Sequence, residues 1–503
     1  MAKSRSRYEM LPPMSEKEVN EKYKQIKAQQ KSKTIARKRN LTKGHIKELV
    51  VKFRSARDAQ KFAKSIHQNI KIEAKCITYD PLQKGVGRFI GEPAKPLQQF
   101  GLDAFYQKHW VGMPEFEQEN SKWEWHRLRV GFRSWDAYKA FAVVVRQFLK
   151  KTTSTIYYPK WLPADLKNRV WKSTLPASKK ITRYPIYVVS KGRAYSRLTS
   201  KALEAMGLPY FIVVEPQDYE DYATVIDKKK ILKLPEDTNP EFPTGPGRAR
   251  NFCRDHSWLN GHQRHFVLDD NIEGFYRLHK NRRFRVADGA IFRAAEDFVD
   301  RYSNILVAGF QYRFFCASKS KYPPFVTNTR IYSCLLIDNR ILFKWKRNKR
   351  VRDDEIPVAV KAKKTDKTGA GLFLWHERYN EDTILSLDAM ENGFATVQFN
   401  AFLQGKSGTQ KLAGGNSDLF YIPEQVNEKS TAENRFYNEG GTIRKSLTLE
   451  KCYPSVARMV WKFNRPHHEV NYSKYKNIPL KRKSNIKTNP AVNYYGMKLV
   501  REA

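Results

Sequence analysis

Residues 265–271 read HFVLDDN, an apolar run that ends in two acids and an amide. A short run of this kind predicts a buried β-strand. Asp269 would be the last residue of that strand and Asp270 the first of the turn, so their side chains would diverge. Open α/β sheets bind ligands at the carboxyl ends of their strands. Because Mg²⁺ and Mn²⁺ take oxygen ligands, the aspartate pair predicts a metal site that grips a diphosphate.

Three further short runs and three helical patterns precede or adjoin this stretch. The runs are YPIYVVS (184–190), PYFIVVE (209–215) and KKKILKLP (228–235), and the helices are expected at 197–206, 219–226 and 248–261. Strands that alternate with helices at this spacing predict right-handed βαβ crossovers and a parallel sheet covered on both faces. The glycine pattern typical of dinucleotide binding is missing after the first run. We therefore expect a Rossmann-like, mainly parallel α/β domain that does not bind NAD.

An internal repeat lies upstream of these runs. Residues 48–81 align without a gap to residues 127–160 after a shift of 79 positions. Each copy reads as an alternating strand, a serine N-cap (Ser55 or Ser134), a helix and a second strand. We expect the two strand–helix–strand units to pair into one small α+β domain. It would contact phosphates through Arg54 and Arg133, or serve as a dimerisation or spacer module.

The resulting domain plan has five parts. They are a basic arm at 1–44, the α+β repeat domain at 45–162 (copies at about 46–81 and 125–160), a linker at 163–183, the α/β domain at 184–472 and a basic tail at 473–503.

The composition indicates the class of partner. The chain of 503 residues has 93 Lys and Arg against 51 Asp and Glu, a formal charge of +42. A charge of this size predicts a polyanionic partner, and double-stranded DNA is our first candidate. Basic tracts at 280–285 and 344–352 supply the candidate DNA contacts, which are Arg282, Arg283, Arg285, Lys346, Arg347, Lys349 and Arg350.

Other features concern the compartment. No apolar run approaches the ~18 residues of a membrane span, and the N-terminus has no apolar core of a secretory signal. The five cysteines form no C-x-x-C pair, which favours a reducing compartment. We expect a cytoplasmic protein without a membrane partner.

A second acid pair, Glu381-Asp382, begins an expected amphipathic helix that ends at Gly393. A helix N-terminus keeps a carboxylate ionised, and an ionised carboxylate is what a general base needs. The alternative is that these residues only cap the helix. Further along, His467 and His468 follow a proline, and one of them could complete the metal's coordination sphere.

The order of SKGRAYS (190–196), FIVVEP (211–216), GPGRARN (245–251) and VLDDNIEGF (267–275) resembles GT-A nucleotide-sugar glycosyltransferases. More narrowly, it resembles the phage TET-associated glycosyltransferases that decorate hydroxymethylated DNA bases, over about 184–472. The resemblance implies a GT-A fold, nucleotide-sugar contacts, a metal motif at Asp269, Asp270 and Asn271, and Asp382 as the catalytic base with Glu381 second. The implied nucleotide-sugar contacts are Ser190, Lys191, Gly192, Arg193, Arg248, Arg250, Asn251 and Asn271.

Together these features predict a metal-dependent enzyme. It would move a hexose or pentose from a UDP-sugar to the hydroxymethyl group of a DNA base by inverting displacement. The preferred acceptor is 5-hydroxymethylcytosine and the second 5-hydroxymethyluracil, turned out of the duplex and stacked on aromatic side chains. The alternatives are a DNA-linked sugar, RNA or protein as acceptor, or a non-catalytic basic protein that only binds and shapes DNA.

Overall fold

A computed structural model gives the fold of most of the chain. It describes residues 21–22, 24–25, 44–53, 55–91, 103–117, 126–160, 169–236, 246–316, 322–344, 375, 380–406, 442–462, 465–491 and 494–501. The basic arm and the tract at 345–352 lie almost entirely outside these ranges, so the predictions for Lys346, Arg347, Lys349 and Arg350 fall outside the described residues.

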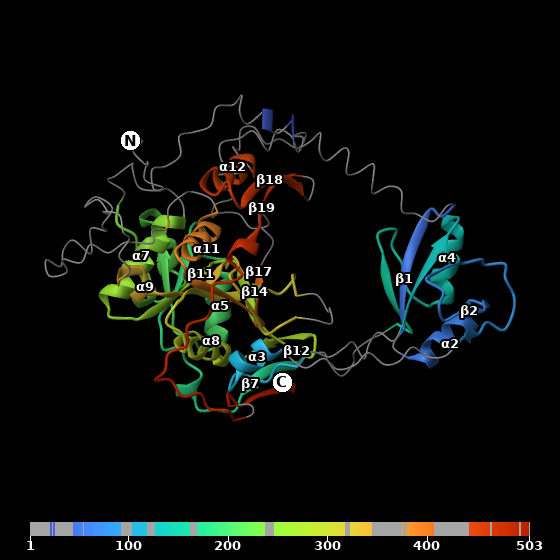
Figure 1. Cartoon of the computed structure of the whole chain (residues 1–503), viewed down its shortest axis with the longest axis horizontal. Helices are drawn as coiled ribbons and strands as arrows, with labels where there is room; N and C mark the ends of the chain where they lie inside the picture. Colours follow the sequence, from blue (N-terminus) through green and yellow to red (C-terminus); the bar gives the residue numbers. More distant parts are fainter. Residues whose placement is uncertain are drawn as a thin grey trace.

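A twelve-stranded mixed sheet dominates the fold (Figure 1). Its strands in spatial order are β10 (Ile231–Lys233), β9 (Phe211–Val214), β8 (Ile186–Ser190), β11 (Arg264–Asp269), β16 (Cys334–Asp338), β14 (Ile305–Tyr312), β17 (Ala395–Lys406), β12 (Ile272–His279), β13 (Arg282–Val286), β7 (Arg169–Ser173) and β20 (Met497–Arg501), with β15 (Phe325–Thr327) paired to β17. The first four strands are mutually parallel. Beyond them the sheet is mixed, because β16 runs antiparallel to both β11 and β14.

Helices cover both faces of this sheet, which confirms the predicted α/β fold class. They are α3 (Ala104–Trp110), α5 (Leu198–Ala205), α6 (Tyr219–Ala223), α7 (Pro246–Leu259), α8 (Ala290–Asp300), α9 (Asn339–Lys344) and α11 (Glu381–Glu391). A further helix, α12 (Thr442–Cys452), packs on α11. Strand residues alternate between two apolar cores. Ile186 and Val188 pack in the core shared with α5 and α8, whereas Tyr187 packs with α7, α9 and α11.

Three segments join the large fold although the sequence predicted otherwise. The expected linker supplies β7 and the expected basic tail supplies β20, and the two pair antiparallel at the end of the sheet. Residues between the repeats supply α3, and its Trp110 packs among Phe298, Phe325 and Phe402. In β7 and β20 the buried Val170, Trp171 and Met497 lie beside lysine or arginine residues, so the high charge of these two strands masked an inward-facing apolar side.

The repeats form a separate four-stranded sheet with its own apolar core (Figure 1). The first copy contributes β1 (Lys47–Phe53), α2 (Ala56–Ser65) and β3 (Cys76–Thr78), and the second contributes β5 (His126–Phe132), α4 (Trp135–Val144) and β6 (Thr155–Tyr158). Each copy pairs its first strand with the second strand of the other copy. The order β3-β5-β1-β6 is that of a ferredoxin-like βαββαβ unit. Ser55 and Ser134 cap the helices by accepting from backbone N–H groups.

A small β-hairpin is formed late in the sequence, outside the large sheet. It consists of β18 (Ala457–Lys462) and β19 (Arg465–Val470), lies beside α12 and shares an apolar cluster with α11 (Figure 1).

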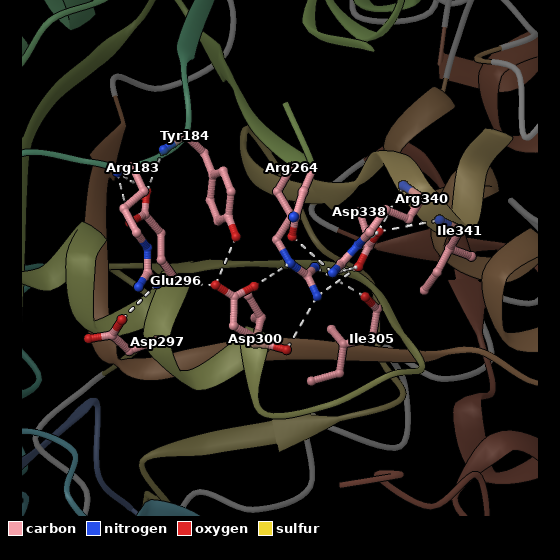
Figure 2. Close-up of polar contacts among 12 residues, drawn as sticks. Arg183, Tyr184, Arg264, Glu296, Asp297, Asp300, Ile305, Asp338, Arg340 and Ile341 are labelled. Atoms are coloured by element: carbon pink, nitrogen blue, oxygen red, sulfur yellow. Dashed lines mark hydrogen bonds and ion pairs between the residues drawn. The ribbon is translucent and has the colours of Figure 1, made fainter. Parts of the chain in front are cut away.

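A polar network ties the large sheet to α8 at the amino end of β11 (Figure 2). Arg264, fully buried, pairs with Asp300 at 2.9 Å and with Asp338 at 2.8 Å. The buried Glu296 accepts hydrogen bonds from the backbone N–H groups of Arg183 and Tyr184. This edge is occupied by structural ion pairs. None of the helices in the described ranges has the length and apolar character needed to cross a bilayer.

Candidate active site

The predicted carboxyl edge of the sheet gathers several polar side chains. Strands β8, β9, β11, β14 and β17 run in one direction, as the pairing through the antiparallel β16 requires. They therefore end at one edge, at Ser190, Val214, Asp269, Tyr312 and Lys406. Ligands of open α/β sheets bind at this edge. The amino edge of β11 holds the network of Figure 2 instead.

Asp269 lies between two cations. Its Oδ1 is 2.7 Å from Arg250 Nη2, and its Oδ2 is 2.6 Å from Lys406 Nζ. Burial alone would raise the pKa of Asp269, but Lys406 and Arg250 hold it far below its usual range. Lys406 also donates to Ser333 Oγ at 2.7 Å, and the backbone of Ser333 accepts from Asp269 N at 2.8 Å. Asp269 is therefore ionised and held in place from three sides.

Arg250 links Asp269 to the second acid pair. This fully buried guanidinium lies 3.3 Å from Glu381 Oε1 and 3.3 Å from Asp382 Oδ1, and it stacks on Trp375. The two acids begin α11, as the sequence predicted. Asp269 and the Glu381-Asp382 pair are 112 residues or more apart in sequence, and one arginine of α7 brings them together.

Asp382 has the titration behaviour that a general base needs. Burial raises its pKa to about 7, with Glu381 and Asp269 adding to the rise and Arg250 opposing it. Its Oδ2 accepts a hydrogen bond from Ser333 N at 3.2 Å. A catalytic base works best when its pKa lies near the operating pH. The side chain is only 11% exposed, so its position is set by these contacts.

Asp270 faces the opposite way, toward β8. Its Oδ2 accepts from Ser190 Oγ at 2.8 Å, and its Oδ1 lies 2.5 Å from Arg193 Nη1. Ser190 Oγ is also 2.5 Å from Tyr222 Oη, which accepts from Arg193 N. Burial raises the pKa of Asp270, and Arg193 and Ser190 oppose that rise. The side chains of the two aspartates therefore diverge.

The other predicted nucleotide-sugar contacts have varied surroundings. Gly192, which adopts a left-handed φ of 62°, donates its N–H to Asp218, and Lys191 beside it is exposed. Arg248 contacts Glu215 and the backbone of Pro235, at the end of β9. Asn251 exchanges two hydrogen bonds with the backbone of Trp375, so it anchors the residue on which Arg250 stacks. Asn271 is buried, and its Oδ1 has no hydrogen-bond partner among the described residues.

The predicted metal ligands do not fit a divalent ion in this arrangement. Mg²⁺ and Mn²⁺ need several oxygen atoms free of other cations, whereas both oxygens of Asp269 already bind a lysine and an arginine. His467 and His468 lie on the β18–β19 hairpin, and His467 Nδ1 is 2.6 Å from the carbonyl of His468. Within the described ranges, the clusters with three or more suitable ligand atoms are His45–Glu48–Cys76 and Glu115–Glu117–His279. Neither contains the aspartates or these histidines.

The described members of the predicted DNA-contact set lie on β13. Arg285 is exposed and reaches over Gly274, which pairs with Gly405, the residue before Lys406 on β17. Arg283 instead donates to the backbone carbonyl of Arg313 at 2.8 Å. Among Arg282, Arg283 and Arg285, Arg285 is therefore the best placed to contact DNA.

Sequence reasoning missed Lys406 and Ser333. Lys406 is the last residue of the twelve-residue strand β17, and polar, glycine-containing sequence follows it directly. The apolar run before it was the one available signal. Ser333 has no sequence signal, because its role depends on the pairing of β16 with β11.

The comparison with known families identifies the class of enzyme to which this fold belongs. Residues 184–415 match the family model described as TET-Associated Glycosyltransferase. A glycosyltransferase moves a sugar from an activated donor to an acceptor. The prediction of a glycosyltransferase is thereby confirmed.

One solved structure is also similar. It is a putative nucleotide-diphospho-sugar transferase from Desulfovibrio desulfuricans G20, with 9% identity and a TM-score of 0.23 over 43% of this chain and 79% of that chain. Comparison with curated proteins gives no significant match.

Proposed function

We propose that the chain transfers a sugar from a UDP-sugar to the hydroxymethyl group of a modified pyrimidine in DNA, with 5-hydroxymethylcytosine preferred over 5-hydroxymethyluracil. The observation that carries the proposal is Asp382, a buried carboxylate whose pKa is raised to about 7. It shares Arg250 with Asp269 at the ligand-binding edge of the sheet. A base with this pKa can take the proton of an alcohol near neutral pH.

The donor would lie against β8 and β9. Ser190, Arg193 and Asp270 form one bonded group at the end of β8, and Arg248 lies at the end of β9. Arginine suits phosphate because its planar guanidinium offers paired donors. The orphan Oδ1 of Asn271 can accept a hydrogen bond from a sugar hydroxyl.

The chemical step is a direct displacement. The acceptor oxygen attacks the anomeric carbon, the bond from that carbon to the diphosphate oxygen breaks, and Asp382 takes the hydroxyl proton. The attack comes from the face opposite the diphosphate, so the configuration inverts. UDP leaves with its added charge balanced by Lys406 and Arg193. Glu381, ion-paired with Arg250, contributes to the raised pKa of Asp382. Because Asp269 and Asp270 are already paired with cations, the proposed step does not run through a metal at these aspartates.

The +42 charge favours DNA over a small acceptor, because binding through several phosphates uses such a charge. The test is to incubate the protein with a panel of UDP-sugars and a duplex that contains 5-hydroxymethylcytosine, 5-hydroxymethyluracil or neither. Nucleoside mass spectrometry reads the product, with Mg²⁺, Mn²⁺ or EDTA present. A sugar found on hydroxymethylated nucleosides alone supports the proposal. Transfer to RNA or protein but not to DNA would overturn the acceptor assignment.

A further inference from the structure

Two aromatic side chains are exposed in the turn that follows β14. Phe314 is 60% exposed and Phe315 is 45% exposed, and their ring centroids lie 4.3 Å apart. Phenylalanine is usually buried, and adjacent exposed rings mark binding sites more often than chance. The fold itself gains little from holding these rings in water.

The turn is nevertheless fixed by hydrogen bonds. Arg313 N donates to the carbonyl of Gln404 at 2.8 Å, and the carbonyl of Arg313 accepts from Arg283 Nη1. Phe315 N donates to the carbonyl of Tyr312 at 3.1 Å, and its own carbonyl accepts from Tyr322 Oη. The aromatic rings are thus presented in one position before any ligand arrives, which lowers the entropy cost of binding.

A stack of rings joins this turn to the catalytic group. Phe314 lies nearly parallel to Tyr312, with centroids 5.3 Å apart and 13° between planes, and Tyr312 in turn stacks on Tyr332. Tyr312 Oη lies 2.7 Å from Ser333 Oγ. Ser333 is the residue whose backbone N–H donates to Asp382 and whose hydroxyl binds Lys406. The exposed stack therefore ends beside the proposed base.

The turn also has the charge that suits a nucleic acid. Arg313 is exposed, and its guanidinium lies 4.3 Å from the centroid of Tyr276, which keeps it beside the rings. In the order of the sheet, β14 and β17 lie on one side of β11, and β8 and β9 lie on the other. The donor group at β8 and the aromatic turn at β14 thus flank Asp269 from opposite sides. This separation assigns the turn to the acceptor, not to the uracil of the donor.

We propose that Phe314 and Phe315 form the acceptor-base platform: a pyrimidine turned out of DNA stacks on Phe314, with Arg313 on a neighbouring phosphate. The proposal rests on the proposed function and names the part of the site that receives the base. A flipped base needs a stacking partner, and aromatic rings accept any base because every base has a π-face.

The experiment compares Phe314→Ala, Phe314→Leu and Phe314→Trp with the wild-type chain. Because base stacking on an aromatic ring is worth about 1–3 kcal/mol, Phe314→Ala should raise the KM for hydroxymethylated DNA by roughly 5- to 150-fold. The KM for the UDP-sugar should stay unchanged. Phe314→Trp should keep the KM for DNA near the wild-type value. Phe314→Leu should raise the KM as Phe314→Ala does, since leucine keeps the apolar area but has no π-face. Phe148→Ala, an 85% exposed phenylalanine in the segment after α4, is the matched control.

Equal KM values for DNA in the wild type and Phe314→Ala would overturn the platform, and so would a rise confined to the donor KM. The proposed function fails separately, if the wild type moves no sugar to hydroxymethylated DNA. In that event, stacking on Phe314 is tested by the fluorescence of 2-aminopurine placed at a mismatch in the duplex. Quenching of its fluorescence by the wild type but not by Phe314→Ala supports stacking, and equal signals refute it.

Discussion

Arg250 Nη1 lies 3.3 Å from Asp382 Oδ1, in a site where the arginine is 2% exposed. The same guanidinium bonds Asp269 at 2.7 Å. The electrostatics of Asp269 and of the proposed base Asp382 are therefore coupled through one side chain. Each carboxylate changes the charge that Arg250 offers to the other, so substitution of one should be visible in the titration of the other.

Asp382→Asn should abolish most transfer and leave donor binding intact. An amide cannot take the acceptor proton, and loss of a general base costs about 10²- to 10⁴-fold in rate. Single-turnover transfer measures the loss, and titration with a UDP-sugar measures donor binding. Glu381→Gln is the control on the same helix turn, and its loss should be much smaller. If the two variants lose equal activity, the assignment of Asp382 as the base is wrong.

The pH profile should report Asp382 directly. Because the base must be ionised and its pKa is raised to about 7, kcat/KM should rise with pH and level off above about 7. Asp269→Asn removes a negative charge that raises this pKa, and it leaves Arg250 paired only with Glu381 and Asp382 among its three carboxylates. The inflection of the residual activity should therefore move to lower pH. An inflection that moves up, or stays in place, contradicts the coupling through Arg250.

The cations around Asp269 lead to a prediction about metal binding. For Mn²⁺ to reach Asp269 Oδ2, it must displace the ammonium group of Lys406, which lies 2.6 Å away. Lys406→Ala frees that oxygen and removes a competing charge, so the affinity for Mn²⁺ should rise at least about tenfold, or ~1.4 kcal/mol. Electron paramagnetic resonance of free Mn²⁺ measures the affinity.

Lys191→Ala removes an exposed lysine at the end of β8 and should leave the affinity for Mn²⁺ unchanged. Asp269→Asn combined with Lys406→Ala should return it to the wild-type level. Tight binding of Mn²⁺ by the wild type, unaffected by Lys406→Ala, would mean that the ion uses other ligands.

The local parts of the fold could be predicted from the sequence. The runs that became β8, β9 and β11 are short and apolar, and the ends of these strands lie within two residues of their predicted positions, whereas β10 covers only the central residues of its run. The helix at Glu381–Glu391 also begins where its acid pair predicted. In these cases the pattern of burial within one segment decides the structure.

The parts that depend on distant pairing could not be predicted. Lys406 reaches Asp269 only because β17 pairs with β14 and β12 in a particular register. Strands β7 and β20 are more than 320 residues apart, and each alone reads as a basic tail or linker. The sequence does not show whether an aspartate is free to bind a metal ion or is paired with a cation from a distant segment. The two aspartates therefore predicted a metal site where the structure has salt bridges.

The network of Figure 2 predicts how stability responds to pH. Burial raises the pKa of Glu296 to about 7, above its unfolded value of 4.5, although the N–H groups of Arg183 and Tyr184 oppose the rise. Between these values the folded chain keeps a proton that the unfolded chain has lost. The contribution of Glu296 to stability is therefore full below about pH 4.5 and falls as pH rises through 7, by at most about 1.4 kcal/mol per pH unit.

Glu296→Gln cannot ionise, so its stability relative to the wild type should improve from pH 5 to pH 8. Denaturant unfolding at both pH values measures the difference, with Asp136→Asn, an exposed carboxylate on α4, as control. A gap between Glu296→Gln and the wild type that is constant with pH would show that Glu296 is ionised throughout.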